Sequence, residues 1–591
     1  MEPLNFYTER ITVYRNRIKK LRKRIATVAI LRLTSFVFLG LSLYFLSRQY
    51  AVPLLLISVF FLICFIIFIR VSLNLQSAKQ LSEKMLFINE NELRVINHGE
   101  NGFNDGKEIA ATAIYRDDLD IFGPRSLYHL LNRTATSHGS EALSALLTSP
   151  LRSNKEIAER QEATRHFSTQ PELGQLIAAQ GLLHAETEGN MNDLSEWMET
   201  PQKLAGIAWL NIIRIVLPIW NIAALLYYLS ENNPLPVIAG VALSWLIISV
   251  FLKYIHTQHR LIGKKQPILE QYGSILQYFG QTDAGNVTRL RSLKEKTASG
   301  RQEIWKLSKL AASFDQRLNL VVFMFANSLL LYDVQCMIAL EKWRSRNKRH
   351  FSEWADCVGS IEALNSLSVF AFNNPGYCYP TVEEGAPFIK ATGMAHPLMQ
   401  LKAPVANDLC VGKEDKLLLV TGSNMSGKST FLRTVGINLL LAQCGAPVYA
   451  DTFAFTPMNI LSSIRISDSL QENTSYFMAE LKRLHDIIAE LEKDAPALVL
   501  IDEVLRGTNS DDKTYGSEAF IRKLLRYPCI ALFATHDLSL SELEKALPQE
   551  VNNYCFESSI ENGELLFDYA LRRGVAKNKN ASFLMEKMGI I

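Results

Sequence analysis

Apolar and polar residues are distributed unevenly along the chain, and four long apolar stretches lie in its first half. The stretch 51–69 carries no charge and is long enough to cross the hydrocarbon core as a helix, at about 1.5 Å of rise per residue. The stretch 26–46 precedes it and contains one cation, Arg32. Residues 204–229 and 235–252 form a second pair around the turn-like sequence ENNPLP. We therefore predict two transmembrane helical hairpins with four spans.

Buried core helices are the alternative interpretation of each pair. This alternative is stronger for the second pair, because the stretch 204–229 carries Arg214 and Pro218. The expected orientation follows from the basic residues, which lie on the cytoplasmic side of spans. They gather in residues 15–24, before the first span, and after the last span at Lys253, His256, His259 and Arg260. We therefore predict an integral membrane protein whose N-terminus and C-terminal half are cytoplasmic.

Helical periodicity appears in two places outside the apolar stretches. Residues 119–167 have Leu, Ala and Ile at helical spacing, and residues 266–367 show the same pattern. Within the second segment, the apolar part of 310–343 is interrupted too often for a fifth span, so we expect a long packed helix there. Residues 341–350, EKWRSRNKRH, contain five Lys and Arg side chains. They could contact phosphate, but a solvated helix face is the commoner role of such a run.

Composition limits the classes of protein that fit the chain. Its 591 residues exceed what one hydrophobic core usually supports, so about two to four domains are expected. A formal net charge of +3 argues against both a polybasic nucleic-acid binder and an acidic disordered protein. The eight cysteines are dispersed without a CxxC pair, which indicates reduced thiols rather than a disulfide framework or a metal site.

The strongest motif lies where a short apolar strand leads into a glycine-bounded loop and then a helix. Residues 416–441, KLLLVTGSNMSGKSTFLRTVGINLLL, match GxxxxGK[ST], in which backbone N–H groups at a helix N-terminus surround phosphates. We expect Lys428 to contact the β- and γ-phosphates of ATP and Ser429 to give its hydroxyl to Mg²⁺. The predicted ATP- and phosphate-binding residues are Gly422, Ser423, Asn424, Met425, Ser426, Gly427, Lys428, Ser429 and Thr430.

Two further strands end in polar residues that suit phosphate chemistry. ALVLIDE ends at Asp502 and Glu503, and CIALFATHD has Thr535 and His536 near its end. The carboxyl ends of parallel strands meet at one edge of a sheet, where ligands bind. We predict Asp502 as a Mg²⁺ ligand, Glu503 as the base that polarises the attacking water, and His536 as a γ-phosphate contact. A lone histidine at a strand end is usually structural, but its place beside the other motifs favours the functional role. With Lys428, Glu503 and His536 are the candidate catalytic residues.

Three segments, GSNMSGKST, LIDEVLRGTNSDD and FATHDL, resemble the ATPase of the MutS family, which belongs to the ATP-binding-cassette class. AHPLM around His396, SYFMAE at 475–480 and the tail GVAKNKNASFLMEKMGI extend the resemblance over residues 389–591. The resemblance implies Mg²⁺-dependent ATP hydrolysis at composite sites of a homodimer. In such a dimer Ser475 would reach across to the partner's nucleotide.

Other positions follow the family pattern or depart from it. Asn424 and the Arg-Gly-Thr segment 506–508 match family positions. Leu505 stands where the family commonly has Gly, and Asn509 also departs, which is expected to alter communication between paired sites rather than hydrolysis. Residues 119–167, with FGPRSLYHLLNRTATSHG and IAERQEA, resemble the family's core or lever domain.

The resemblance further implies binding of mismatched or branched DNA and a role in DNA repair. The family's N-terminal mismatch-reading domain, with its aromatic wedge, has no recognisable counterpart, and the first apolar hairpin stands in its position. The second hairpin falls roughly where the family places its DNA-gripping clamp. The alternative function is therefore an ATP-driven machine for membrane remodelling, signalling or transport that does not bind DNA.

The predicted fold is an α/β P-loop NTPase domain with an ABC-type parallel sheet, joined to an all-α lever and core domain and to two transmembrane helical hairpins. We expect a basic cytoplasmic N-terminus at 1–25, hairpins at 26–70 and 204–252, helical core segments within 71–203 and 253–385, and the MutS-type ATPase domain at 386–591. The expected ligands and partners are ATP, Mg²⁺, a second copy of the chain, the lipid bilayer and DNA.

Overall fold

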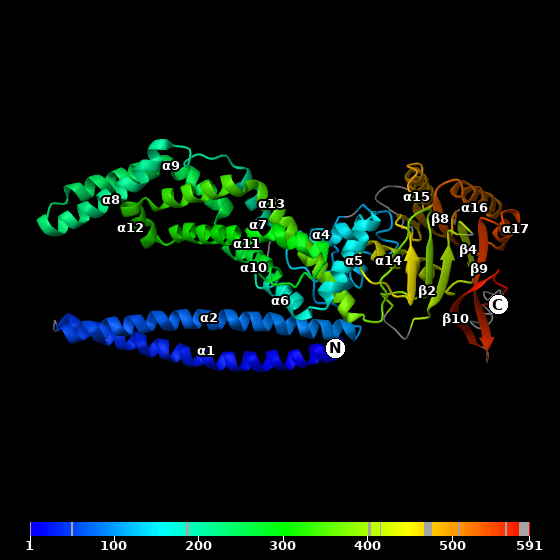
Figure 1. Ribbon diagram of the computed structural model, residues 1–591, viewed down its shortest axis with the longest axis horizontal. Coiled ribbons are helices and arrows are strands. Elements are labelled where there is room, and N and C mark those ends of the chain that lie inside the picture. Colours follow the sequence, from blue (N-terminus) through cyan, green and yellow to red (C-terminus); the bar gives the residue numbers. More distant parts are fainter. Residues whose placement is uncertain are drawn as a thin grey trace.

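The computed structural model is elongated, with helices at one end and two β-sheets at the other (Figure 1). It describes residues 2–48, 51–110, 112–184, 188–399, 404–413, 415–465, 476–505, 509–561, 564–577 and 590. Ser475, the segment 506–508 and most of the tail that follows 577 lie outside the described residues. The predicted trans-acting role of Ser475 therefore stays a prediction.

The first hairpin consists of two helices that run side by side, α1 (Pro3–Arg48) and α2 (Val52–Ile96). At about 1.5 Å per residue, each is about 68 Å long, well beyond the predicted spans. The helix α1 runs without a break through the expected boundary at 25/26, because no Gly or Pro interrupts the basic segment before it. The base of the hairpin is buried against the rest of the chain, for example at Tyr7 and Met85.

The second hairpin, α8 (Ala208–Glu231) and α9 (Leu235–Ile262), packs against a third apolar helix, α12 (Leu320–Leu330). Asn221 joins the three, because its Nδ2 donates to Ser244 Oγ at 3.1 Å and to the Ser328 carbonyl at 3.0 Å. Such a buried amide is stabilised by its partners in apolar surroundings.

The long packed helix expected within 310–343 is wrong, because the chain breaks twice there. Asn319 caps the start of α12 by accepting from the N–H groups of Val321 and Val322. Leu331 then adopts a left-handed conformation, with φ of +52°, and ends α12. The next helix, α13 (Tyr332–Asn373), leaves at 84° to α12. The cap at Asn319 therefore begins the exposed apolar helix α12, and the strained residue Leu331 separates it from the packed helix α13.

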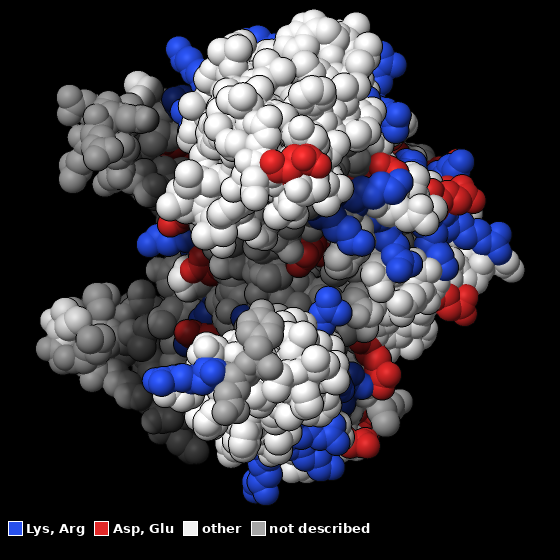
Figure 2. Space-filling view, turned by 90° about the vertical axis from the view of Figure 1, so that its left-hand side faces the viewer, with Lys and Arg blue, Asp and Glu red and all other residues white. Residues whose placement is uncertain are grey.

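Among the residues that the structure describes, four helices, α1, α2, α8 and α9, are long and apolar enough to cross a membrane. The bent pair of α12 and α13 would make a fifth span if it were counted as one. Both hairpins point their far ends in the same direction (Figure 1). Seen from that end, their surfaces consist mainly of uncharged side chains, with Lys and Arg gathered around the edges (Figure 2). Individual apolar side chains there are well exposed, such as Phe60 at 60% and Leu226 at 63%.

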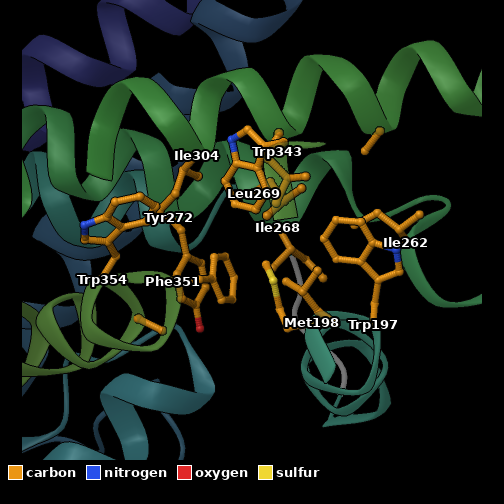
Figure 3. Packing of buried hydrophobic residues seen from close by; sticks show 14 of the residues in the cluster. Trp197, Met198, Ile262, Ile268, Leu269, Tyr272, Ile304, Trp343, Phe351 and Trp354 are labelled. Atoms are coloured by element: carbon orange, nitrogen blue, oxygen red, sulfur yellow. The ribbon is translucent and has the colours of Figure 1, made fainter. Parts of the chain in front are cut away.

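Between the hairpins and the sheets lies a helical core around α13. Trp197 stacks on Trp343 with ring centroids 6.5 Å apart, and Trp354 and Tyr272 are buried in the same cluster (Figure 3). The remaining helices of this part are α3 (Leu127–Leu131), α4 (Ser137–Thr148), α5 (Asn154–Ser168), α6 (Pro171–Gly181), α7 (Glu188–Glu199), α10 (Gln266–Phe279), α11 (Thr288–Asp315) and η1 (Gln316–Leu318). The eight cysteines are all free, as the sequence predicts.

The C-terminal part contains a six-stranded sheet of order β10-β9-β4-β8-β7-β6, in which all neighbours are parallel except β10 and β9. Its strands are β4 (Leu417–Gly422), β6 (Asn459–Ser463), β7 (Ala497–Asp502), β8 (Cys529–Thr535), β9 (Val551–Glu561) and β10 (Glu564–Arg573). Strands β4, β7 and β8 are buried along their whole length, which explains their continuous apolar sequences.

Helices and a smaller sheet surround the six strands. The helices are α14 (Lys428–Gln443), α15 (Tyr476–Leu491), α16 (Ser510–Leu524), η2 (Leu538–Glu542) and α17 (Leu543–Ala546). The smaller sheet has the order β1-β5-β2-β3, with strands β1 (Thr381–Val382), β2 (Ile389–Met394), β3 (Asn407–Val411) and β5 (Thr452–Phe455). This mixed α/β arrangement agrees with the predicted class of the C-terminal part.

Candidate nucleotide-binding site

Three neighbouring parallel strands bring the predicted residues to one edge of the sheet. Strand β8 lies between β4 and β7, with Val420 opposite Ala534 and Asp502 opposite the same alanine. The loop 423–427 follows β4, Glu503 follows β7, and His536 follows β8. The sequence motifs therefore converge because the register of the sheet aligns the ends of their strands.

The loop after β4 depends on glycine at two positions. Gly427 has φ of +105°, and a Cβ there would lie 3.1 Å from the Tyr569 ring. A Cβ at Gly422 would lie 2.7 Å from Ser426 Oγ and 3.0 Å from the Phe556 carbonyl. Any larger residue would therefore shift the loop or its neighbours.

Cationic and polar groups of the loop fit an anion. Lys428 is buried at the N-terminus of α14, and its Nζ donates to the carbonyls of Gly422 at 2.8 Å and Ser423 at 2.9 Å. Ser426 Oγ is also buried, and it has no hydrogen-bond partner among the described residues. Phosphate oxygens would satisfy this hydroxyl, and the positive end of the α14 dipole favours the same charge.

Ser429 and Asp502 are paired at the expected place. The Ser429 hydroxyl donates to Asp502 Oδ2. A hydroxyl and a carboxylate beside a phosphate-binding loop are hard oxygen ligands of the kind that Mg²⁺ takes together with water and substrate phosphates. The two side chains therefore fit the magnesium role predicted for them.

Glu503 and His536 form a second pair. His536 Nε2 lies 2.9 Å from Glu503 Oε1, and it also lies 3.4 Å from Lys428 Nζ. Glu503 has φ of +56°, which is rare for a residue other than Gly, Asn or Asp and marks local strain. His536 thus contacts both of the other candidate catalytic side chains, Glu503 and Lys428.

Leu505, one of the departures from the family pattern, has φ of +58°. Glycine adopts this conformation without steric cost, which gives a physical reason for its common use there. In this chain the backbone N–H of Leu505 donates to Glu480 Oε1 at 2.6 Å, and Glu480 is fully buried. Glu480, the last residue of the SYFMAE segment, therefore holds the turn after the second carboxylate in place.

A cavity of about 670 Å³ opens beside the loop and is lined by predicted residues from 424 to 430 together with Asp502, Glu503 and His536. The rest of its lining was not predicted from the sequence and consists mainly of apolar groups: Met394, Met399, Val405, Phe556 and Tyr569. His396 also lines it, and burial lowers the pKa of this histidine to about 4, with a further contribution from Arg433. At neutral pH this part of the lining is therefore uncharged and suits a flat aromatic base.

Comparison with known proteins places these segments in a family. The family model for MutS domain V matches residues 418–587, and that for MutS domain III matches residues 110–208. The DNA mismatch repair proteins MutS of Thermotoga petrophila and Thermotoga maritima are each 34% identical over 235 residues, which is 39% of this chain and 29% of theirs. MutS protein homolog 4 of Mus musculus is 34% identical over 195 residues, or 31% of this chain and 20% of the relative. The matched region spans less than a third of the length of each of these relatives. Since two family models and these relatives agree, the chain belongs to the MutS family.

Proposed function

We propose that this protein is a membrane-anchored ATPase of the MutS family. The observation that carries the proposal is the convergence of Lys428, the Ser429–Asp502 pair and the Glu503–His536 pair at one sheet edge, beside a cavity with an uncharged wall. ATP fits this arrangement, with its phosphates in the loop and its base against the apolar side.

Each polar group has a distinct role in the proposed reaction. Lys428 neutralises charge on the β- and γ-phosphates, and Ser429 and Asp502 would hold Mg²⁺. A Mg²⁺ ion bound by these two side chains would supply positive charge to stabilise the negative charge that develops on the reacting phosphate. Glu503 accepts a hydrogen bond or proton from the attacking water, and His536 donates to Glu503 and holds its carboxylate in place.

Substitution Glu503→Gln tests the catalytic assignment. It keeps the shape of the side chain and removes its basicity, so we expect ATP turnover to fall by about 10²- to 10⁴-fold with little change in nucleotide affinity. The matched control is Glu550→Gln, which removes a carboxylate paired with Lys416 at the opposite end of β4. Turnover by the Glu503 variant within threefold of the control would refute the role of Glu503.

Membrane anchoring rests on the two apolar hairpins, whose mainly uncharged ends face the same direction (Figure 2). One bilayer could therefore take up both at once, with the sheets well outside it. Because Lys and Arg gather before the first span and after the fourth, we propose that the N-terminus and the ATPase part are cytoplasmic.

We further propose a homodimer that binds DNA. Support comes from the family and from the relatives named as DNA mismatch repair proteins. Binding of the detergent-solubilised protein to matched, mismatched and branched duplexes, with and without ATP and over a salt series, tests this part. Binding that responds to nucleotide supports a membrane-tethered DNA-repair ATPase, whereas no binding at low salt contradicts it.

The second candidate function is an ATP-driven membrane machine that does not bind DNA. One observation favours it: α13 runs from the sheets to the apolar helix α12, which packs on the second hairpin. Closure of two ATPase parts could then move helices within the bilayer. Failure of every DNA substrate, together with ATP-dependent solute movement in proteoliposomes, would select this candidate.

A further inference from the structure

A groove of about 500 Å³ lies between α11 and α13, on the side of the helical core nearer the apolar end. Four cations line it: Lys306 and Lys309 from α11, and Lys342 and Arg346 from α13. The floor includes Trp343, which is only 6% exposed and packs into the hydrophobic cluster beneath (Figure 3). Two of these cations belong to the basic run at 341–350, whose role the ATPase site leaves unexplained.

The charge of the groove is not balanced within it. Glu303 is the one acidic residue among its lining residues, and it accepts from Lys306 at 2.5 Å and from Asn347 at 3.1 Å. Glu341, the neighbour of Lys342 in the chain, is fully buried and accepts from the backbone of Ala205 and from Tyr254.

Three groove cations remain without a counter-charge. Lys309, Lys342 and Arg346 have no ion pair or hydrogen bond within the part of the chain that the structure describes. The groove therefore presents about three uncompensated positive charges around a concave surface, an arrangement that suits an anion with several oxygens.

The position of the groove indicates which anion it meets. Lys309 lies six residues before the end of α11, or about 9 Å along the helix, and Lys342 lies ten residues, or about 15 Å, from the start of α13. Between those two helix ends, the chain exposes Leu320 at 70% and Phe325 at 68%. If those apolar side chains enter the hydrocarbon region, the lysine side chains extend to the level of the lipid headgroups.

We propose that this groove binds the phosphate group of an anionic phospholipid at the cytoplasmic surface of the membrane. The inference rests on the proposed membrane anchoring. Arg346 can contact two phosphate oxygens at once, and Lys309 and Lys342 act as point charges beside it. Lipid phosphate is favoured over nucleic-acid phosphate because the groove opens next to the exposed apolar helix α12, at the depth where lipid headgroups lie.

Native mass spectrometry of the full-length protein in neutral detergent can test the groove, with phosphatidylglycerol and phosphatidylcholine as probes. The test variant is Lys309→Gln with Lys342→Gln. The matched control is Lys296→Gln with Arg349→Gln, which removes two exposed cations from the same helices, about 28 Å from the end of α11 and about 26 Å from the start of α13. We expect the Kd for the first phosphatidylglycerol to rise about fivefold for each groove cation removed, and less than twofold in the control.

Several outcomes would overturn the proposal. Equal Kd values for the test and control variants would do so, as would no preference of the parent protein for phosphatidylglycerol over phosphatidylcholine. Inorganic phosphate or a short DNA duplex that binds with higher affinity than the lipid, and only when Lys309 and Lys342 are present, would assign the groove to that ligand instead. Incorporation of all variants into phosphatidylcholine nanodiscs is scored separately, so failure of the membrane anchor is distinguishable from failure of the lipid site.

Discussion

Substitution Glu92→Gln should destabilise the contact between the base of the first hairpin and the rest of the protein. Glu92, near the end of α2, accepts from Arg133 Nη2 at 2.9 Å and from Asn373 Nδ2 at 2.8 Å, and Asn373 in turn accepts from Tyr7 at 2.7 Å. The side chains of Glu92 and Arg133 are 1% and 3% exposed. The pair therefore connects α2 to the segment after α3, and the hydrogen bonds through Asn373 extend this network to Tyr7 of α1 and to the end of α13.

The expected magnitude follows from this burial. A neutral side chain at 92 leaves the Arg133 charge buried without its partner, which typically costs about 3–5 kcal/mol. If the lower value applies to local opening, amide exchange at the end of α2 should accelerate about 150-fold. The joint substitution Glu92→Met with Arg133→Met removes both charges and should recover much of the loss.

Hydrogen exchange of the full-length protein measures this opening. The control is Glu90→Gln, two residues away, which removes an exposed ion pair with Arg15 at 2.6 Å. Because those side chains are 38% and 64% exposed, the pair contributes less than about 1 kcal/mol, and exchange should change less than about fivefold. Equal effects of the two substitutions would refute the structural role of the buried pair.

Three further predictions concern the ATPase part. Burial lowers the pKa of His396 from 6.5 to about 4 in the folded protein, so between these two pH values the unfolded chain binds a proton that the folded protein does not. The free energy of unfolding should therefore fall by about 3 kcal/mol as the pH drops through this range. The substitution His396→Asn should flatten this part of the acid unfolding curve. A Cβ at Gly436 would lie 2.8 Å from Leu500 and 2.9 Å from Leu119, so Gly436→Ala should cost about 1–3 kcal/mol in thermal unfolding, and an unchanged Tm would contradict this packing. Ser429→Ala should raise the Mg²⁺ concentration for half-maximal ATP turnover at least about tenfold, and an unchanged Mg²⁺ dependence would remove Ser429 from the metal site.

Much of the nucleotide site was predictable because its residues follow strands directly. In a parallel sheet the end of each strand has a fixed place, so the loop at 422–430, the Asp502–Glu503 pair and His536 could be brought together from sequence alone. The apolar part of the cavity's lining could not be predicted in this way. Met394 ends a strand of the smaller sheet, and Tyr569 comes from the antiparallel edge strand, so only tertiary packing brings them together.

The helical half shows a similar limit. Long apolar stretches predicted four membrane-length helices, because hydrophobic length is a local property. The break at Leu331 carries no Gly or Pro signal, since a leucine is held there in a left-handed conformation by the packing around it. The Glu92–Arg133 pair joins residues 41 positions apart and has no signature in the pattern of apolar and polar residues.

Co-flotation of the full-length protein with neutral liposomes, combined with ATP turnover in the floated fraction, tests the central claim most directly. The account predicts that the protein floats with lipid after a high-salt wash and hydrolyses ATP there, and that the Lys428→Ala variant floats equally but hydrolyses no ATP. A protein that hydrolyses ATP but stays with the soluble fraction would contradict the membrane anchor. One that floats without Mg²⁺-dependent turnover would contradict the ATPase.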